Sequence, residues 1–220
     1  MTLQNTQKKK TKFAIILASL ALVGTMAIGG ISAYFTDKEV ANNVFTVGSG
    51  VNITIDEPSW DPEDPEHNNI VPGDVFAKDP QITNGGDVTA YAFMSVAVPY
   101  KNVVTVNDDG SKNEPADTEL FTYDVNSGWT EVGSPVRDEV NGVVKHVYVY
   151  GSSEACTALA KNETTPSVFD EVKFVNIAEG SVSDETLTIP VTAYAIQSDN
   201  IEGDVTDPVG VWSVLSNQTV

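Results

Sequence analysis

Apolar residues of this chain fall in short runs, and glycine, proline, asparagine and aspartate separate the runs. In Val51–Ile55 apolar and polar residues alternate, which predicts a strand with one buried and one solvated face. Over Val88–Val98 both alternating sets of positions are largely apolar, which predicts a strand in the middle of a sheet. The other predicted strands are Leu120–Val125, Val143–Tyr150, Val172–Ile177, Leu187–Ile196 and Val209–Leu215. Many short strands with turn residues between them predict an all-β fold, an antiparallel sandwich or barrel.

One segment departs from the strand pattern. Ser152–Asn162 begins with two serines that can cap a helix, and it continues with glutamate, alanine and leucine, which are good helix formers. Asn162 and Pro166 would end the helix. We therefore expect one short helix inserted between the strands.

Two acidic stretches, Trp60–Glu66 and Asn107–Pro115, interrupt the strands with prolines and turn residues. Their candidate ligand residues are Asp61, Glu63, Asp64, Glu66, Asp108 and Asp109. Calcium is the ion that such carboxylates favour, since it takes about six to eight oxygen ligands. Neither stretch has the spacing of an EF-hand loop, so a solvated acidic loop is the alternative interpretation.

The N-terminus has a different composition. Residues 8–12 include four lysines and precede an apolar run over Phe13–Ile31, and small residues follow it. This order predicts a secretory signal peptide, cut between Ala33 and Tyr34. An uncleaved membrane anchor is the alternative, because the run is about as long as the shortest membrane spans. The predicted organisation is a removed signal helix over 1–33, an N-terminal segment over 34–50 and a single β-sandwich domain over 51–220.

The charge of the chain limits its partners. The net charge is −19, and removal of the leader takes away lysines and no acidic residue. A surface this acidic argues against nucleic acid and against anionic membranes as partners. Contact with a membrane is therefore expected only through an uncleaved signal. The one cysteine, Cys156, allows no internal disulfide and is expected to be a small buried residue.

The motifs of the chain give no catalytic residue. The two histidines, His67 and His146, do not form a His-Glu-x-x-His pair, and with one cysteine they cannot complete a His/Cys zinc cage. No Gly-x-Ser-x-Gly elbow and no phosphate-binding glycine loop is present. A Cys156–His146 pair is conceivable, but the spacing gives it no support.

Several short motifs point to a family. They are Tyr34-Phe35-Thr36-Asp37, Asn43-Val44-Phe45-Thr46-Val47-Gly48, the turn motifs Pro72-Gly73-Asp74 and Asn84-Gly85-Gly86, and Ala193-Tyr194-Ala195-Ile196-Gln197. Together they resemble the TasA/CalY (camelysin-like) family of exported proteins of Gram-positive bacteria. The first motif is similar to the start of proteins that a dedicated SipW-type signal peptidase cuts.

The resemblance implies a jelly-roll-like antiparallel β-sandwich and a role in the extracellular matrix of a biofilm or at the cell surface. It also implies head-to-tail fibres, in which the N-terminal segment of one subunit adds as a strand to the next copy or to a related matrix subunit. The expected donor-strand residues are Tyr34, Phe35, Val44, Phe45 and Val47. An ordinary first strand that folds back onto its own sheet is the alternative.

Part of the same family is described as camelysin, a casein-cleaving metalloprotease. A secreted metalloendopeptidase is therefore the enzyme alternative, and a non-polymerising surface adhesin is a third interpretation. We expect no organic cofactor, and calcium is the one candidate ion. The expected partners are the SipW-type signal peptidase and the chain itself or a related subunit.

Overall fold

A computed structural model of the chain describes residues 36–40, 43–45, 50–107, 109–180, 182, 186–201, 203 and 205–219. The chain divides into two units, residues 1–33 and 34–220, and every described residue belongs to the second. The predicted signal helix and its cleavage site at Ala33 and Tyr34 lie outside the described residues. So do Phe35, Val47 and Asp108.

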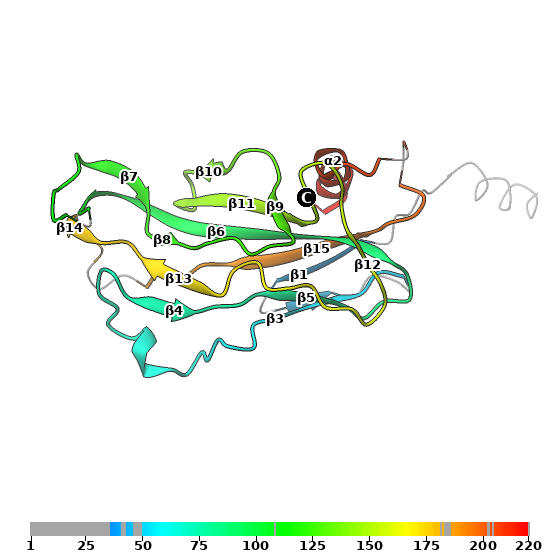
Figure 1. Cartoon of the computed structure of the whole chain (residues 1–220), viewed down its shortest axis with the longest axis horizontal. Helices are drawn as coiled ribbons and strands as arrows, with labels where there is room; N and C mark the ends of the chain where they lie inside the picture. The colour runs from blue at the N-terminus through cyan, green and yellow to red at the C-terminus, as the bar shows by residue number, and fades with distance from the viewer. Residues whose placement is uncertain are drawn as a thin grey trace, which may run out of the picture. The chain divides into compact units, whose positions relative to one another are not determined.

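The fold is organised around one long strand, β6 (Ala90–Thr105). β6 pairs antiparallel with β11 (Val143–Tyr150) along one side and with β15 (Val191–Gln197) along the other (Figure 1). The path through this main sheet is β10–β11–β6–β15–β1–β2. Its outer strands are β10 (Val136–Asp138), β1 (Thr36–Val40) and β2 (Asn43–Phe45). Beside the path, short strands pair with β6 or β11: β7 (Ala116–Glu119), β9 (Trp129–Glu131), β12 (Ala158–Leu159) and β14 (Ile177–Glu179).

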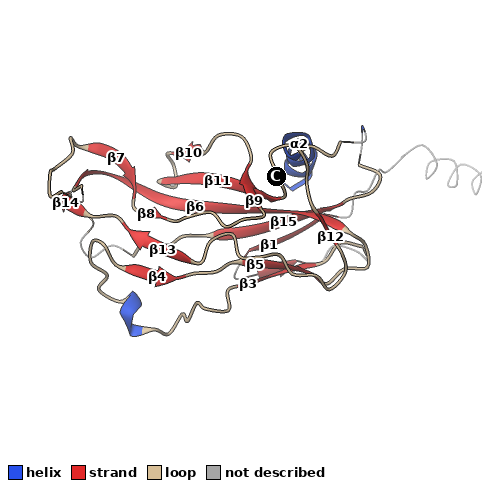
Figure 2. Ribbon diagram, viewed as in Figure 1, coloured by secondary structure: helices blue, strands red, loops and turns tan. Residues whose placement is uncertain are grey.

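Smaller elements cover both faces of the main sheet. One small sheet contains β4 (Val75–Ala77), β13 (Glu171–Phe174) and β8 (Phe121–Thr122), and the other contains β3 (Ile53–Asp56) and β5 (Gln81–Asn84). These sheets share an apolar core with β6 and β15. The helix α2 (Pro208–Thr219) packs on the opposite face over a second core, and a short 3-10 helix, η1 (Pro65–His67), precedes β4 (Figure 2). The predicted all-β sandwich is confirmed.

The burial along β6 explains its central place. Met94 and Val96 are buried in the core beneath the small sheets, whereas Tyr91 and Phe93 are buried in the core beneath α2. Burying an apolar side chain of this size contributes about 1.5–3 kcal/mol, so a strand that is apolar on both faces is most stable between two covering layers. The prediction of a central strand from Val88–Val98 is confirmed.

The other predicted strands differ mainly in their bounds. Val143–Tyr150 is confirmed at both ends. Val51–Ile55 and Leu187–Ile196 correspond to β3 and β15, each of which starts later along the chain. Leu120–Val125 shrinks to β8, and Val172–Ile177 is divided between β13 and β14.

The predicted helix over Ser152–Asn162 is wrong. The hydroxyl of Ser152 accepts from the backbone N–H groups of Glu154 and Ala155, so it caps a turn instead of a helix. The chain then pairs with β6 through β12, where Leu159 is buried. A segment this short gains little as an isolated helix, so backbone pairing and burial outweigh its helix propensity.

The predicted strand over Val209–Leu215 is also wrong, because these residues belong to α2. Asp207 accepts from the backbone N–H of Gly210 and Pro208 occupies the first turn, which is the usual start of a helix. Val211 and Leu215 are fully buried at the four-residue spacing of one helix face.

Candidate functional site

The N-terminal segment forms a hairpin at one end of the main-sheet path. β1 pairs antiparallel with β15 in a register that runs from Thr36 opposite Ile196 to Val40 opposite Thr192. β2, which contains Val44 and Phe45, pairs back onto β1. β1 also contacts β3 and α2. In the single chain the segment therefore completes its own sheet, and its donation to a second chain stays a prediction.

Gly50 and Asn52 are held by the turn that follows β5. The N–H of Asp87 donates to the carbonyl oxygen of Gly50 over 3.1 Å, and the N–H of Gly85 donates to that of Asn52 over 2.8 Å. A Cβ on Gly86 would lie 2.5 Å from the Gly50 oxygen, so this close approach requires glycine. The turn motif Asn84-Gly85-Gly86 thus fixes the chain just after the N-terminal segment.

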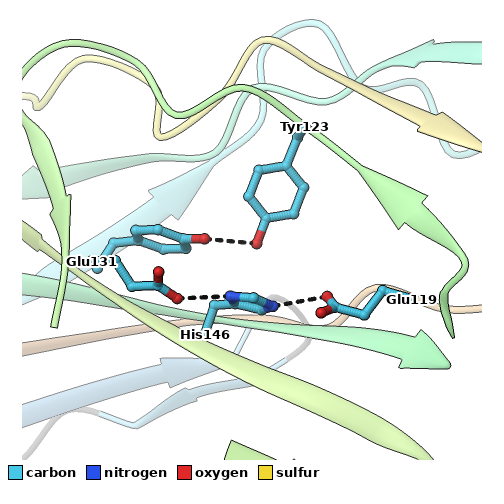
Figure 3. Close-up of polar contacts among 5 residues, drawn as sticks. Glu119, Tyr123, Glu131 and His146 are labelled. Atoms are coloured by element: carbon cyan, nitrogen blue, oxygen red, sulfur yellow. Dashed lines mark hydrogen bonds and ion pairs between the residues drawn. The ribbon is translucent and has the colours of Figure 1, made fainter. Parts of the chain in front are cut away.

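A second cluster of functional side chains surrounds His146 on β11. Its Nδ1 lies 2.8 Å from Oε1 of Glu131, and its Nε2 lies 2.8 Å from Oε2 of Glu119 (Figure 3). The hydroxyls of Tyr123 and Tyr148 are hydrogen-bonded to each other over 2.9 Å, and both rings lie beside the imidazole. The cluster therefore joins β7, β9 and β11 through side chains.

Burial shapes the chemistry of this cluster. It raises the pKa of Tyr148 to about 12 and raises that of Tyr123 as well, so both phenols stay protonated at neutral pH. An open hollow of about 260 Å³ lies beside these side chains, and Phe121, Thr122 and Val125 complete its lining. Two acidic and several aromatic side chains thus face the hollow.

Both ring nitrogens of His146 have a carboxylate partner, Nδ1 with Glu131 and Nε2 with Glu119, so the imidazole is held from two sides. Sequence reasoning missed Glu119, Glu131, Tyr123 and Tyr148, since no local spacing relates them to His146.

Cys156 lies on the other face of β11 from His146. Val147 and Val149 of β11 pack with Cys156 in the core beneath α2, while His146 alternates with them and points the opposite way. Burial, followed by the nearby charge of Asp207, raises the pKa of the Cys156 thiol to about 12. A Cys156–His146 catalytic pair is therefore wrong.

The acidic loop after β3 is anchored by aromatic and charged contacts. Trp60 stacks on His67 with ring centroids 4.1 Å apart, and Nζ of Lys78 lies 5.0 Å from the Trp60 ring centroid. Lys78 is buried and pairs with Glu57 over 2.6 Å. Asp79, also buried, accepts from the backbone N–H of Ser59. The loop is held against the domain by these contacts.

Three of the carboxylates predicted to bind calcium accept hydrogen bonds within their own loops. Asp61 and Asp64 each accept from a backbone N–H two residues on, those of Glu63 and Glu66. Asp109 accepts from Ser111 in the other loop, which lowers its pKa. Among the described residues no group of three or more His, Cys, Asp or Glu side chains could hold a metal ion. Calcium binding stays a prediction.

Comparison with known proteins identifies a family relationship. The family model of the camelysin metallo-endopeptidases matches residues 6–122. The match spans the N-terminal hairpin and Glu119, and it ends before Glu131 and His146. No curated protein and no solved structure matches the chain significantly. Within the described part of the chain, no helix is long and apolar enough to cross a membrane.

Proposed function

The chain belongs to the camelysin metallo-endopeptidase family, the family of the TasA/CalY-type secreted proteins, and from this premise we propose that it is a structural protein of the extracellular matrix. In this proposal it is a fibre subunit or an accessory of fibres. Assembly proceeds head to tail, with the N-terminal segment of one chain added as a strand to the next. Contacts of this kind do not close into a ring, so they extend into a filament.

The observation that supports the proposal is the place of the N-terminal segment in the sheet. The residues that follow the predicted cleavage site form β1, and β1 lies at the end of the main-sheet path with only β2 outside it. Its sequence, Thr36-Asp37-Lys38-Glu39-Val40, is mostly polar. A polar strand of this kind pairs mainly through backbone hydrogen bonds. Backbone hydrogen bonds are also what holds a strand that is added to the edge of a sheet.

Signal cleavage belongs to the same proposal. A SipW-type signal peptidase that cuts between Ala33 and Tyr34 would release the segment from the leader. The chain then carries its donor strand at a free N-terminus. Export and the start of assembly are thereby coupled to one cut.

Electron microscopy of the secreted form tests this function. Its N-terminus is first determined by sequencing, and the protein is then concentrated at several pH values. The proposal expects filaments from protein that begins at Tyr34. Protein that begins there and stays monomeric at high concentration across the pH range would contradict assembly by this chain alone.

The family description favours a second candidate, a secreted metalloendopeptidase. A catalytic zinc ion is usually held by three converging protein ligands with one position left open. Glu119 and Glu131 face opposite nitrogens of His146, so these three side chains do not converge on one point. Nδ1 of His67 is buried without a hydrogen-bond partner, and its ring is packed between Trp60 and Phe76. The described residues therefore do not fit a zinc centre.

Casein digestion separates the two candidates. The purified secreted protein is incubated with casein, with and without a chelator, and bound metal is measured by mass spectrometry. The structural proposal expects no cleavage. Zinc-dependent cleavage that the chelator abolishes would establish the peptidase.

A further inference from the structure

The chain contains two Asn-Gly dipeptides, Asn84-Gly85 and Asn141-Gly142. An asparagine before a glycine is open to attack on its side chain, because glycine has no Cβ to keep its backbone nitrogen away from the asparagine Cγ. The fold places the two asparagines in opposite environments, since Asn84 is fully buried and Asn141 is exposed.

The side chain of Asn84 is held by buried hydrogen bonds. Its Nδ2 donates to two backbone carbonyl oxygens, and its Oδ1 accepts from the N–H of Gly86 over 2.9 Å. The nitrogen that would attack is that of Gly85, and its N–H donates to the carbonyl oxygen of Asn52 over 2.8 Å. Both reacting groups are engaged, so a reaction here would first have to break several hydrogen bonds.

Asn141 lies in the turn between β10 and β11. Val140 beside it is 94% exposed, and Gly142 after it has a φ of 66°, a left-handed conformation that favours glycine. Nδ2 of Asn141 donates to Oδ2 of Asp138 over 2.8 Å. A hydrogen bond at the surface exchanges readily with water, so this contact leaves the side chain free to turn toward the next backbone nitrogen.

Water also reaches this dipeptide. Asn141 and Gly142 line an open hollow of about 400 Å³, together with Tyr100 and the segment 186–188. A water molecule takes about 30 Å³ in the liquid, so the hollow has room for several. The surroundings of Asn141 therefore supply both the solvent base and the water that a reaction of its side chain consumes.

We propose that Asn141 is a site of spontaneous covalent modification in the folded protein. The backbone nitrogen of Gly142 gives its proton to a solvent base and bonds to Cγ of Asn141, and Nδ2 leaves as ammonia. Water then opens the cyclic imide at either of its carbonyl carbons. One opening yields aspartate, and the other yields isoaspartate, in which the main chain passes through Cβ and Cγ. The inference is independent of the proposed function.

The modification would weaken the hairpin. Both products replace the amide donor of Asn141 by a carboxylate, so Asp138 would face a like charge where it now accepts a hydrogen bond. Isoaspartate also adds a methylene to the main chain of the turn. β10 pairs with β11 over three residue pairs at the end of the main-sheet path, so we expect it to open locally after the reaction.

Peptide mapping of the stored protein tests the proposal. The purified secreted protein is incubated at neutral and at mildly alkaline pH and is then digested with an acid protease, which limits further reaction. Mass spectrometry measures the gain of about 1 Da where a hydroxyl replaces an amide NH₂. Chromatography separates the isoaspartate peptide from the aspartate peptide.

Asn141 should react at least about a hundredfold faster than Asn84, because Asn84 has several buried hydrogen bonds to break first. Its rate should rise with pH, since the attacking nitrogen has to lose a proton. In guanidinium chloride the two asparagines should react at similar rates, because the fold no longer protects Asn84.

Two variants complete the test. Asn141→Gln is the matched control, since its longer side chain would have to close a larger ring. Isoelectric focusing should show an acidic band that grows during incubation of the wild type, and the variant should lose most of this band. Asn141→Asp supplies one product directly, and hydrogen exchange over 136–138 should be faster in this variant than in the wild type.

Three results would overturn the modification. They are an Asn141 that stays intact in the folded protein while it reacts in guanidinium chloride, equal rates for Asn84 and Asn141 in the folded protein, and aspartate without isoaspartate. Unchanged hydrogen exchange over 136–138 in Asn141→Asp would overturn the local opening of β10. None of these results depends on whether the protein forms filaments.

Discussion

At the scale of single residues, Asn84 joins three parts of the chain. It is fully buried, and its Nδ2 donates to the carbonyl oxygens of Val88 and Leu159 over 2.9 Å each. Its Oδ1 accepts from the N–H of Gly86. One side chain thus satisfies three backbone groups beside the turn that fixes Gly50. The sequence indicated a tight turn at Asn84-Gly85, but the partner at Leu159 is distant and could not be predicted from it.

Asn84→Ala should lower the free energy of unfolding by about 2–4 kcal/mol, because buried backbone groups lose their partners. Urea denaturation measures the change. Asn141→Ala is the control, because Asn141 is exposed and its side-chain amide donates to a carboxylate oxygen of Asp138 near the surface. Its effect should stay within about 0.5 kcal/mol. Equal effects of the two substitutions would contradict the role assigned to Asn84.

Cys156 should react slowly in the folded protein. Its thiol pKa is raised to about 12, so almost no thiolate is present at pH 8. A chromogenic disulfide reagent should therefore label it far more slowly in buffer than in guanidinium chloride. The pKa of the thiol is higher in the folded protein than in the unfolded chain, so the buried neutral thiol contributes to the free energy of unfolding. This contribution is complete below about pH 9 and is lost as the pH rises toward 12. Equal labelling rates in the two solvents would show that the thiol is accessible.

At the scale of elements, α2 gives the second core its cover. Val211 and Leu215 are fully buried, and Trp212 packs on Phe93 with ring centroids 5.4 Å apart. The signal for this helix was present in the sequence, in Asp207-Pro208 and in the apolar spacing that follows. The apolar run was interpreted as a strand, so the error lay in the choice between a strand and a helix for the same residues. For Ser152–Asn162 no such signal existed, because its pairing with β6 is a tertiary contact.

Leu215→Ala should destabilise the protein by about 2–5 kcal/mol, since it opens a cavity between α2 and the main sheet. Val209→Ala is the matched control on the same helix, because Val209 is 61% exposed. Its effect should stay within about 0.5 kcal/mol. Urea denaturation followed by tryptophan fluorescence measures both. A small effect of Leu215→Ala would mean that α2 is not required to cover this core.

At the scale of the whole molecule, the alternation of apolar and polar residues was enough to predict the fold class. It also placed the central strand, because a strand that is apolar on both faces has to lie between two layers. The cluster around His146 could not be predicted. Glu119 and Glu131 come from separate strands, and only the pairing of β7 with β6 and of β9 with β11 brings them to one ring.

The role of the whole molecule depends on where β1 binds. The sequence offered two interpretations of the N-terminal segment, donation to a neighbour and pairing with its own sheet. The structure describes the second of these, because β1 pairs with β15 of its own chain; donation to a neighbour stays a prediction.

A helical reconstruction of filaments grown from the secreted protein tests this account most directly. The decisive feature is the connection from the strand beside β15 to Gly50. Assembly by donation of the N-terminal strand predicts that residues 36–40 on each β15 trace to the Gly50 of a neighbouring subunit. Filaments in which every β1 traces to the Gly50 of its own subunit would contradict it.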